Sequence, residues 1–174
     1  MKFDINQRIH LMVGCPGSGK STYIAKHLCD KSICISRDEV RKSFVGEDVN
    51  DNNYFSREDE VFDKFIELIN QAIDNGYEHI YIDATHISEP SRAKVLKRIK
   101  VKDDVALILE VFNTPLEVCL ERNAKRTGFS RVPDSAINNM WRGFSFPRLN
   151  EFNGKYGFKQ VSINEHACKG GDSL

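Results

Sequence analysis

The stretch Gly14-Cys15-Pro16-Gly17-Ser18-Gly19-Lys20-Ser21 decides the fold of this chain. It fits the pattern G-x-x-x-x-G-K-[ST] of a phosphate-binding P-loop, in which Gly residues let the backbone curl and aim its N–H groups at one anion. The apolar residues 8–13 before it predict a buried strand, and residues 21–29 after it predict a helix. Because this is the setting in which a P-loop works, we predict a nucleotide-phosphate site rather than a Gly-rich surface turn.

Each part of the loop has a role in binding ATP and Mg²⁺. The backbone N–H groups and the positive end of the helix dipole attract phosphate. Lys20 can reach the β- and γ-phosphates, and the Ser21 hydroxyl can hold Mg²⁺. Because the Cys15 thiol lies within the loop, we expect its alkylation to inactivate the protein. The residues predicted to bind the cofactor are Gly14, Cys15, Pro16, Gly17, Ser18, Gly19, Lys20, Ser21 and Thr22.

The composition is that of one globular domain. The 174 residues include 25 basic and 25 acidic ones, so no overall field draws the protein to nucleic acid or to a membrane. The five cysteines are scattered, which favours reduced thiols. No apolar run approaches the ~18 residues of a membrane span, and the N-terminus begins no signal stretch. We expect a cytoplasmic protein with a P-loop kinase domain over residues 1–167 and a flexible tail over 168–174.

Apolar strands alternate with helices along the rest of the chain. This order predicts an α/β fold, a parallel sheet of about five strands flanked by helices and completed by a helical lid. In such sheets ligands bind beyond the carboxyl ends of the strands, so we expect the residues there to share one cleft. The further strands are predicted at 32–36, 79–83, 104–112 and 158–163. One further helix is predicted to begin at residue 37. Another begins at a capping box at Ser56 and ends at Gly76, a third runs from a cap at Ser88 to residue 99, and the last two lie at 116–126 and 134–144.

Asp38 and Arg41 follow the second predicted strand and share one helical face. The crossover from the P-loop can bring Asp38 near the γ-phosphate, where a carboxylate accepts the proton of an attacking hydroxyl. The alternative is that Asp38 is the N-cap of a helix that begins at Glu39. Arg41 can hold a substrate phosphate through two hydrogen bonds, or it forms an i,i+3 ion pair on the surface.

Asp83 ends the third predicted strand, and His86 follows it closely. Asp83 is placed as a Walker-B Asp is and can hold Mg²⁺ or its bound water; the alternative is an Asp that starts a turn. For His86, a surface or hydrogen-bonded role is favoured over catalysis.

A basic segment with a Gly break follows, in which Arg122, Lys125, Arg126 and Arg131 surround Thr127-Gly128. A hinged cationic segment over a phosphate site has the properties of a lid. Arg126 or Arg131 would then stabilise charge on the transferred phosphoryl group. The alternative is a basic helix C-terminus that the helix dipole favours.

Three further groups of residues are predicted to have ordinary structural roles. The acidic run 47–63 and the basic run 92–102 are predicted to be solvated helix faces. An acidic run beside the acceptor would disfavour a polyanion, whereas one on the far face would not. Core packing is favoured over base stacking for the aromatic residues Trp141, Phe144, Phe146 and Phe152.

Together these segments resemble the kinase module of polynucleotide 5′-hydroxyl kinases, the phage and animal enzymes that heal DNA and RNA ends. The resemblance runs from Leu11 to about Ile163 and rests on residues 14–22, 36–41, 83–86 and 122–126, with His86 where the family usually has Asn. It implies that Asp38 is the general base, that Arg41 binds a phosphate of the substrate and that an Arg of the lid contacts the ATP phosphates.

The predicted reaction is transfer of the γ-phosphoryl group of ATP to a hydroxyl, with the 5′-OH end of DNA or RNA as the favoured acceptor. Lys20, Asp38 and Arg126 are assigned to catalysis, Arg122 and Arg126 to ATP, and Ser21 and Asp83 to Mg²⁺. The residues assigned to the acceptor are Asp38, Arg41, Asp83, Thr85, His86 and Arg131.

Two alternatives stay open beside this prediction. One is a kinase that phosphorylates a nucleoside, a modified DNA base or another small molecule, because these share the same core. The other is an ATP-binding regulatory module with little transfer activity. The sequence leaves the identity of the acceptor and the oligomeric state undecided.

Overall fold

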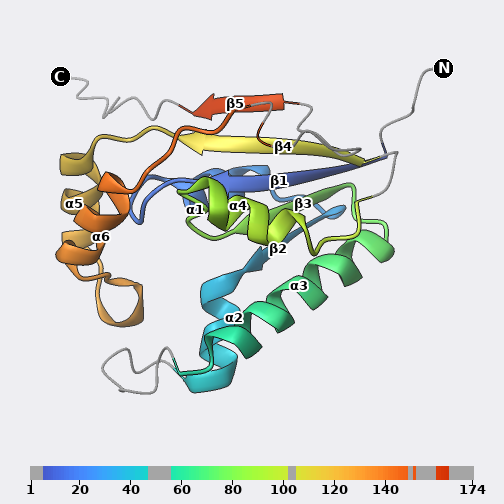
Figure 1. Ribbon diagram of the computed structural model, residues 1–174, viewed down its shortest axis with the longest axis horizontal. Coiled ribbons are helices and arrows are strands. Elements are labelled where there is room, and N and C mark those ends of the chain that lie inside the picture. The colour runs from blue at the N-terminus through green and yellow to red at the C-terminus, as the bar shows by residue number, and fades with distance from the viewer. Residues whose placement is uncertain (1–5, 47–55, 102–104, 149–150, 152–159, 165–174) are drawn as a thin grey trace.

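The computed structural model of the protein describes residues 6–46, 56–101, 105–148, 151 and 160–164. Within them, five parallel strands form one sheet in the order β2-β3-β1-β4-β5, with helices on both faces (Figure 1). The predicted α/β fold is therefore confirmed. The strands are β1 (Gln7–Val13), β2 (Ser32–Ser36), β3 (His79–Asp83), β4 (Val105–Phe112) and β5 (Gln160–Asn164). The helices are α1 (Lys20–His27), α2 (Arg37–Val45), α3 (Glu58–Asp74), α4 (Glu89–Leu96), α5 (Leu116–Ala124), the 3₁₀ helix η1 (Gly128–Ser130) and α6 (Asp134–Arg142).

The two faces of the sheet differ because successive side chains of a strand point to opposite sides. On one face, Ile9 and Leu11 of β1 share a buried apolar core with Phe65 of α3. Figure 1 shows α3 and α4 lying along this side. On the other face, Met12 packs with Ile24 of α1 in a smaller apolar cluster. Burial of these side chains on both faces is the main source of the fold's stability.

A polar network crosses the α1 face of the sheet. His10 of β1 pairs through Nδ1 with Glu110 Oε1 of β4 and through Nε2 with His79 Nδ1 of β3, at 3.0 Å each. Asn164 of β5 donates from Nδ2 to Glu110 Oε2 at 3.0 Å. Burial alone would raise the pKa of Glu110, but the hydrogen bonds from His10 and Asn164 hold it below its usual value. The network therefore satisfies buried polar groups and joins four of the strands.

The predicted element boundaries hold to within a few residues, with one local error. Ser88 caps α4, as predicted, because its side chain accepts from the Ser91 N–H at 3.4 Å. The capping box predicted at Ser56 is wrong. The structure begins α3 at Glu58 after Arg57, and no side-chain hydrogen bond caps it.

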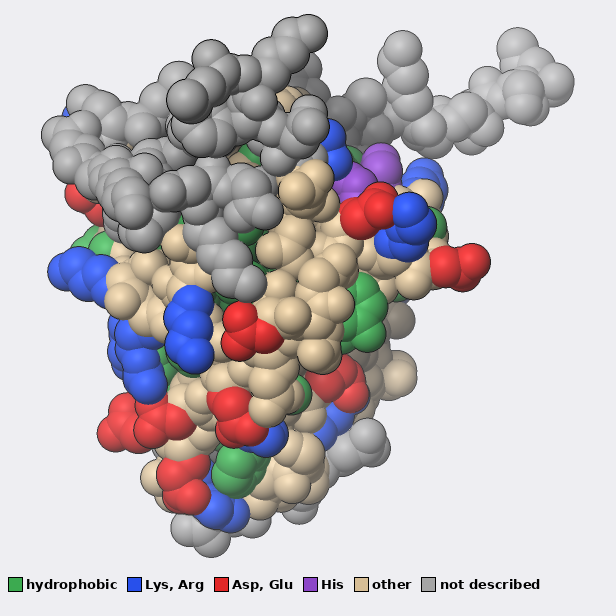
Figure 2. All heavy atoms as spheres, turned by 90° about the vertical axis from the view of Figure 1, so that its right-hand side faces the viewer, with side chains coloured by type: hydrophobic (Ala, Val, Ile, Leu, Met, Phe, Trp, Pro, Cys, Tyr) green, Lys and Arg blue, Asp and Glu red, His purple; other side chains and the backbone are tan. Residues whose placement is uncertain are grey.

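The solvated face predicted for the basic run is confirmed in part. Lys94, Lys97, Arg98 and Lys100 are exposed, but Arg92 is fully buried. Figure 2 shows the side of the molecule at which β1 and β4 begin, where acidic and basic side chains are interspersed. No helix within the described ranges is long and apolar enough to cross a bilayer. The tail predicted at 168–174 lies outside those ranges.

Arg92 is buried because it holds two distant segments together. Its Nε and Nη2 donate to the two carboxylate oxygens of Glu151 at 2.8 and 2.6 Å. Its Nη1 donates to the His86 carbonyl at 3.0 Å, and Nη2 also reaches Ser145 Oγ at 3.2 Å. The guanidinium thus fastens the segment after α6 to α4 and to the loop after β3.

We expect Arg92→Met to lower the free energy of unfolding by about 3–5 kcal/mol, because it leaves the buried Glu151 carboxylate unpaired. The double variant Arg92→Met with Glu151→Met should recover part of that loss. Arg98→Met is the matched control from the same run, because its ion pair with Asp63 is exposed and such pairs contribute about 0–1 kcal/mol. Urea unfolding measures all three, and equal losses in Arg92→Met and Arg98→Met would show that Arg92 does not fasten these segments.

Candidate active site

The P-loop lies between β1 and α1 and depends on two left-handed glycines. Gly17 has φ 82° and Gly19 has φ 106°, a region that only Gly enters without strain. A Cβ at Gly17 would also lie 2.5 Å from the carbonyl oxygen of Cys119 in α5. The curl of the loop is therefore pressed against the helix that leads into the predicted lid.

Lys20 begins α1 and folds back over the loop. Its Nζ donates to the carbonyls of Gly14 and Cys15 at 2.8 and 3.0 Å, and the side chain is buried. Burial lowers the pKa of Lys20, and the charge of Asp83 opposes that shift. Lys20 is thus held against the carbonyls where the loop curls.

The loop after β3 supports the P-loop from one side. The Gly14 N–H donates to the Thr85 carbonyl at 2.9 Å, and His86 Nδ1 donates to the Met12 carbonyl at 2.9 Å. His86 is buried and takes the left-handed φ of 44°, which favours a residue such as Asn or Gly. Thr85 therefore holds the P-loop directly, and His86 holds the strand that leads into it. Of the surface and hydrogen-bonded roles favoured for His86, the structure shows the hydrogen-bonded one.

Thr114, just before α5, and Arg122, in the last turn of α5, support the P-loop from the other side. Thr114 Oγ1 donates to the Ser18 carbonyl at 2.9 Å, and Arg122 Nη1 reaches the Gly17 carbonyl at 3.3 Å. Thr114 follows the end of β4, where the sequence predicts that residues share the cleft, and its hydrogen bond brings it to the P-loop. Beside these contacts lies a cavity of about 350 Å³, which we call the P-loop cavity, lined by Gly17, Gly19, Thr22, Arg122 and Arg126.

Four of the predicted catalytic and metal residues lie close enough to act on each other's charge. Burial raises the pKa of Asp83; Lys20 and Arg126 lower it, and the nearby Asp38 carboxylate raises it further. The charges of Lys20, Asp38 and Arg126, which come from three separate segments, thus all act on Asp83 at the carboxyl end of β3. This is the convergence that the topology of a parallel sheet predicts.

Asp38 is not a helix cap. The helix α2 begins at Arg37, and Ser36 is its N-cap, with its side chain accepting from the Glu39 N–H at 3.5 Å. Asp38 lies in the first turn with its side chain 71% exposed and pairs with Arg41 Nη1 at 2.5 Å. The N-cap alternative for Asp38 is thereby excluded, while the carboxylate stays open to a substrate.

Arg41 is buried and holds more than the predicted surface ion pair. Its Nε and Nη2 donate to the two oxygens of Glu58 in α3 at 2.5 and 3.2 Å, while Nη1 faces Asp38. Burial alone would raise the pKa of Glu58, but Arg41 and Arg37 lower it below its usual value. Sequence analysis placed Glu58 only in an acidic run and missed this contact.

The described part of the acidic run is largely paired with arginines. Glu60 accepts two hydrogen bonds from Arg57, and Asp63 pairs with Arg98. With Glu58 held by Arg41, three of the four acidic side chains in this part of the run are paired, and the exposed Asp59 is the fourth. Residues 47–55 of the run lie outside the described ranges.

The predicted lid reaches across to α2. Lys42 Nζ of α2 lies 4.6 Å from the ring centre of Phe129 in η1, a cation–π contact. Arg126 Nη1 lies 3.4 Å from the Ser130 carbonyl, and Arg131 is exposed at the end of η1. The basic segment therefore spans from the P-loop cavity, which Arg126 lines, to the helix that carries Asp38.

The donor set of the site fits Mg²⁺. Ser21, in the first turn of α1, has an exposed side chain, and the Asp83 carboxylate accepts no hydrogen bond from the residues that the structure describes. Mg²⁺ prefers hard oxygen ligands and takes one or two from the protein beside those of substrate phosphates. Ser21 and Asp83 supply that kind of donor near Lys20.

Cys15 does not have the reactive thiol expected from its place in the loop. Its side chain is 3% exposed in an apolar cluster with Cys119 and Ile137. Burial raises the pKa of Cys15 to about 11, so little thiolate exists at neutral pH. Rapid inactivation by alkylation is therefore no longer expected.

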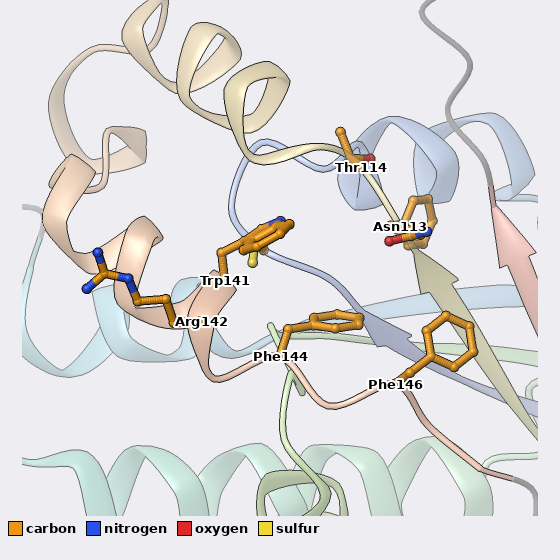
Figure 3. A pocket seen from close by; sticks show the side chains of 8 residues that line it. Asn113, Thr114, Trp141, Arg142, Phe144 and Phe146 are labelled. Carbon is orange, nitrogen blue, oxygen red and sulfur yellow. The ribbon is translucent and has the colours of Figure 1, made fainter.

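The aromatic residues after α5 are another correction. Trp141 and Phe146 are 45% and 46% exposed, so neither belongs to the core as predicted; Phe144 is partly buried against it. Figure 3 shows all three side chains pointing into one cavity. Phe152 lies outside the described residues.

The fold and the loop together define a P-loop, kinase-like nucleotide-binding protein. Its family follows from a match over residues 9–147: the chain belongs to the AAA domain family. A P-loop domain of this kind binds a nucleotide, typically with Mg²⁺.

Individual proteins share parts of this chain. The Arabidopsis thaliana protein named transcription factor bHLH140 is 24% identical over 161 residues, which are 89% of this chain and 16% of that protein. A chain of the Pnkp1/Rnl/Hen1 RNA repair complex is 25% identical with a TM-score of 0.65, over 79% of this chain and 43% of that one. This chain thus spans less than half of either protein.

Two more distant structures show the same fold. A fungal RNA kinase is 10% identical with a TM-score of 0.60, over 94% of this chain and 76% of that one. A sugar kinase from Janibacter sp. HTCC2649 is 16% identical with a TM-score of 0.56, over 92% and 85% of the two chains. At these identities the likeness concerns the fold alone.

We expect His86 to make the protein less stable as the pH falls. Burial, with the nearby cations, lowers the pKa of His86 from 6.5 to about 4, so between these values the unfolded chain takes up a proton that the folded protein does not. Stability is therefore lost progressively as pH falls from about 6.5 towards about 4.

The variant His86→Asn isolates this contribution, because Asn accepts a left-handed φ, keeps an N–H donor and does not titrate. Its free energy of unfolding, measured with urea across that pH window, should fall less steeply than that of the wild type. Parallel pH profiles for the two proteins would show that His86 is not the responsible group.

Proposed function

We propose that this protein transfers the γ-phosphoryl group of ATP to a hydroxyl, and that a 5′-OH end of nucleic acid is the acceptor. The observation that carries the proposal is a P-loop with Lys20 folded over it, Arg126 lining the cavity beside it and an exposed Asp38 after the end of β2. Phosphoryl transfer needs positioning and charge stabilisation above all. Cations for the phosphates and an exposed carboxylate for the hydroxyl are the groups that this reaction uses.

Each residue has a definite task in the proposed reaction. Lys20 and the amides of the P-loop hold the phosphates. Arg126 and Arg122, which line the P-loop cavity, neutralise the negative charge of the phosphates. Asp38 accepts the proton of the attacking hydroxyl. Mg²⁺, held by Ser21 and Asp83, would supply charge that offsets the phosphate oxygens.

The nucleic-acid acceptor is supported by Arg41 and by one comparison. A 5′-OH end presents a phosphate on the 3′ side of its first nucleoside, and the guanidinium of Arg41 matches phosphate geometry. Arg41 lies one helical turn from Asp38, so both could contact the same nucleotide. The 25% identity to a chain of an RNA repair complex favours the same acceptor class.

A small-molecule acceptor is the second candidate, and the pairing of Arg41 favours it. Glu58 and Asp38 already accept hydrogen bonds from the guanidinium, so an acceptor phosphate competes with carboxylates for it. An acceptor without a phosphate faces no such competition. An ATP-binding module with little transfer is the remaining outcome.

Incubation with γ-labelled ATP and a panel of acceptors tests the proposal. The panel holds 5′-OH DNA, 5′-OH RNA, nucleosides and hydroxymethylated duplex DNA, with folded Lys20→Ala as the inactive control. Label on nucleic-acid ends that Lys20→Ala fails to transfer supports the proposal. Label on nucleosides alone shows a small-molecule kinase, and no label on any acceptor with retained ATP binding shows a regulatory module.

Asp38→Asn should lower kcat about 10²-fold or more, because an amide cannot accept the proton. ATP affinity should change little, since Asp38 does not line the P-loop cavity. Helix α2 should persist because Ser36 caps it, and circular dichroism checks this. An unchanged kcat would assign the proton to another group.

Arg41→Ala should reduce kcat/KM for a nucleoside 3′-monophosphate about 10- to 150-fold, because it removes a charge-assisted contact worth about 1.5–3 kcal/mol. It should affect the bare nucleoside much less. Glu58→Gln should act in the opposite direction on the monophosphate, since it weakens the competing ion pair. Equal losses on both acceptors in Arg41→Ala would favour the small-molecule alternative.

A further inference from the structure

A second cavity of about 350 Å³ touches the P-loop at Cys15. We call it the aromatic cavity. Trp141 at the end of α6 and Phe144 and Phe146 after it point into it, and Asn113 and Thr114 border it from the end of β4 (Figure 3). It shares no lining residue with the P-loop cavity.

The aromatic cavity exposes apolar surface that the fold would otherwise bury. Among the described residues, the large hydrophobic side chains that remain exposed are Leu28, Trp141, Phe146 and Ile163, and two of these four line this cavity. Leaving such rings in water is unfavourable, and their grouping in one hollow indicates a ligand site. A volume of about 350 Å³ suits a single small group, since ligand sites range over about 300–1,000 Å³.

The chemistry of the lining selects a neutral planar group. Arg142 is the charged residue of the described lining, and Figure 3 shows its guanidinium pointing away from the rings. The cavity therefore offers no cation to a phosphate. It offers aromatic faces, on which bases stack, and the Asn113 amide, which can donate to and accept from the edge of a base.

We infer that the aromatic cavity binds a nucleobase of the acceptor strand. The inference rests on the proposed function, because the strand is the acceptor named there. The adenine of ATP is the other possible source of a base, because both cavities border the same loop, and titration with Mg²⁺-ATP alone distinguishes the two. Both cavities border the same loop, so a base held here would anchor the strand while its end reacts elsewhere on that loop.

The chain itself carries a probe for this test. Trp141 is the single tryptophan of the sequence, so the indole fluorescence of the whole protein reports on the aromatic cavity. The protein is titrated without ATP with a 5′-OH oligoadenylate, with an abasic strand of equal length, and with Mg²⁺-ATP alone. We expect saturable quenching by the oligoadenylate and no quenching by the other two.

Matched variants assign the site. Phe146→Ala should raise the Kd for the oligoadenylate about 5- to 150-fold, the range for loss of one stacked base. Phe146→Leu, which keeps an apolar side chain, should also weaken binding because it has no aromatic face. Leu28→Ala, which removes an equally exposed apolar side chain outside the cavity, should leave Kd unchanged.

Several results would overturn the inference. They are absence of quenching by the oligoadenylate, equal quenching by the abasic strand, quenching by ATP alone, and equal Kd values for Phe146→Ala and Leu28→Ala. The labelled-transfer assay is independent of fluorescence. Quenching without transfer would therefore contradict the proposed function but support the nucleobase site. Transfer without quenching would support the proposed function but contradict the nucleobase site.

Discussion

The close approach of Gly17 to the Cys119 carbonyl is the contact on which the site depends. No side chain fits between the phosphate loop and α5, so the curl of the loop and the start of the basic segment form one unit. On the other flank, Gly14 at the start of the loop donates to the Thr85 carbonyl, and His86 bonds the Met12 carbonyl of the strand that leads into the loop. The loop is thus fixed before any phosphate arrives, which is the preorganisation that charge stabilisation requires.

Local signals predicted the fold well. The P-loop, the Ser88 cap and the five strands each depend on a few neighbouring residues, and the alternation of elements then determines a parallel sheet. The site was predictable as a set of strand ends, because topology brings those ends together. The partners of its residues were not, since they join segments far apart in the chain.

Three residues show why partners that lie far apart in the chain could not be predicted from the sequence. Arg92 and Glu58 lie in charged runs, and charge alone predicts solvent. Their burial depends on partners 59 and 17 residues away, which no local pattern indicates. Trp141 shows the opposite error. An aromatic residue predicts a buried core position, but Trp141, at the end of α6, is exposed and lines a cavity.

The ion pairs of the two buried arginines, Arg92 and Arg41, differ in how exposed the carboxylate is, and this difference agrees with their positions in the fold. Glu151 is 4% exposed on Arg92, whereas Glu58 is 28% exposed on Arg41. A closed pair is costly to break and suits a structural fastening. In a partly exposed pair, another anion can replace the carboxylate. This suits a residue proposed to bind a substrate.

The network of His10, His79, Glu110 and Asn164 also constrains how the sheet assembles. Since strand side chains alternate with period two, a slip of one residue would turn His10 into the apolar face under α3 and remove it from Glu110. Misregistered pairings thereby lose both hydrogen bonds and solvation. The polar face therefore favours the observed register of the strands, including that of the edge strand β5, in which Asn164 reaches Glu110.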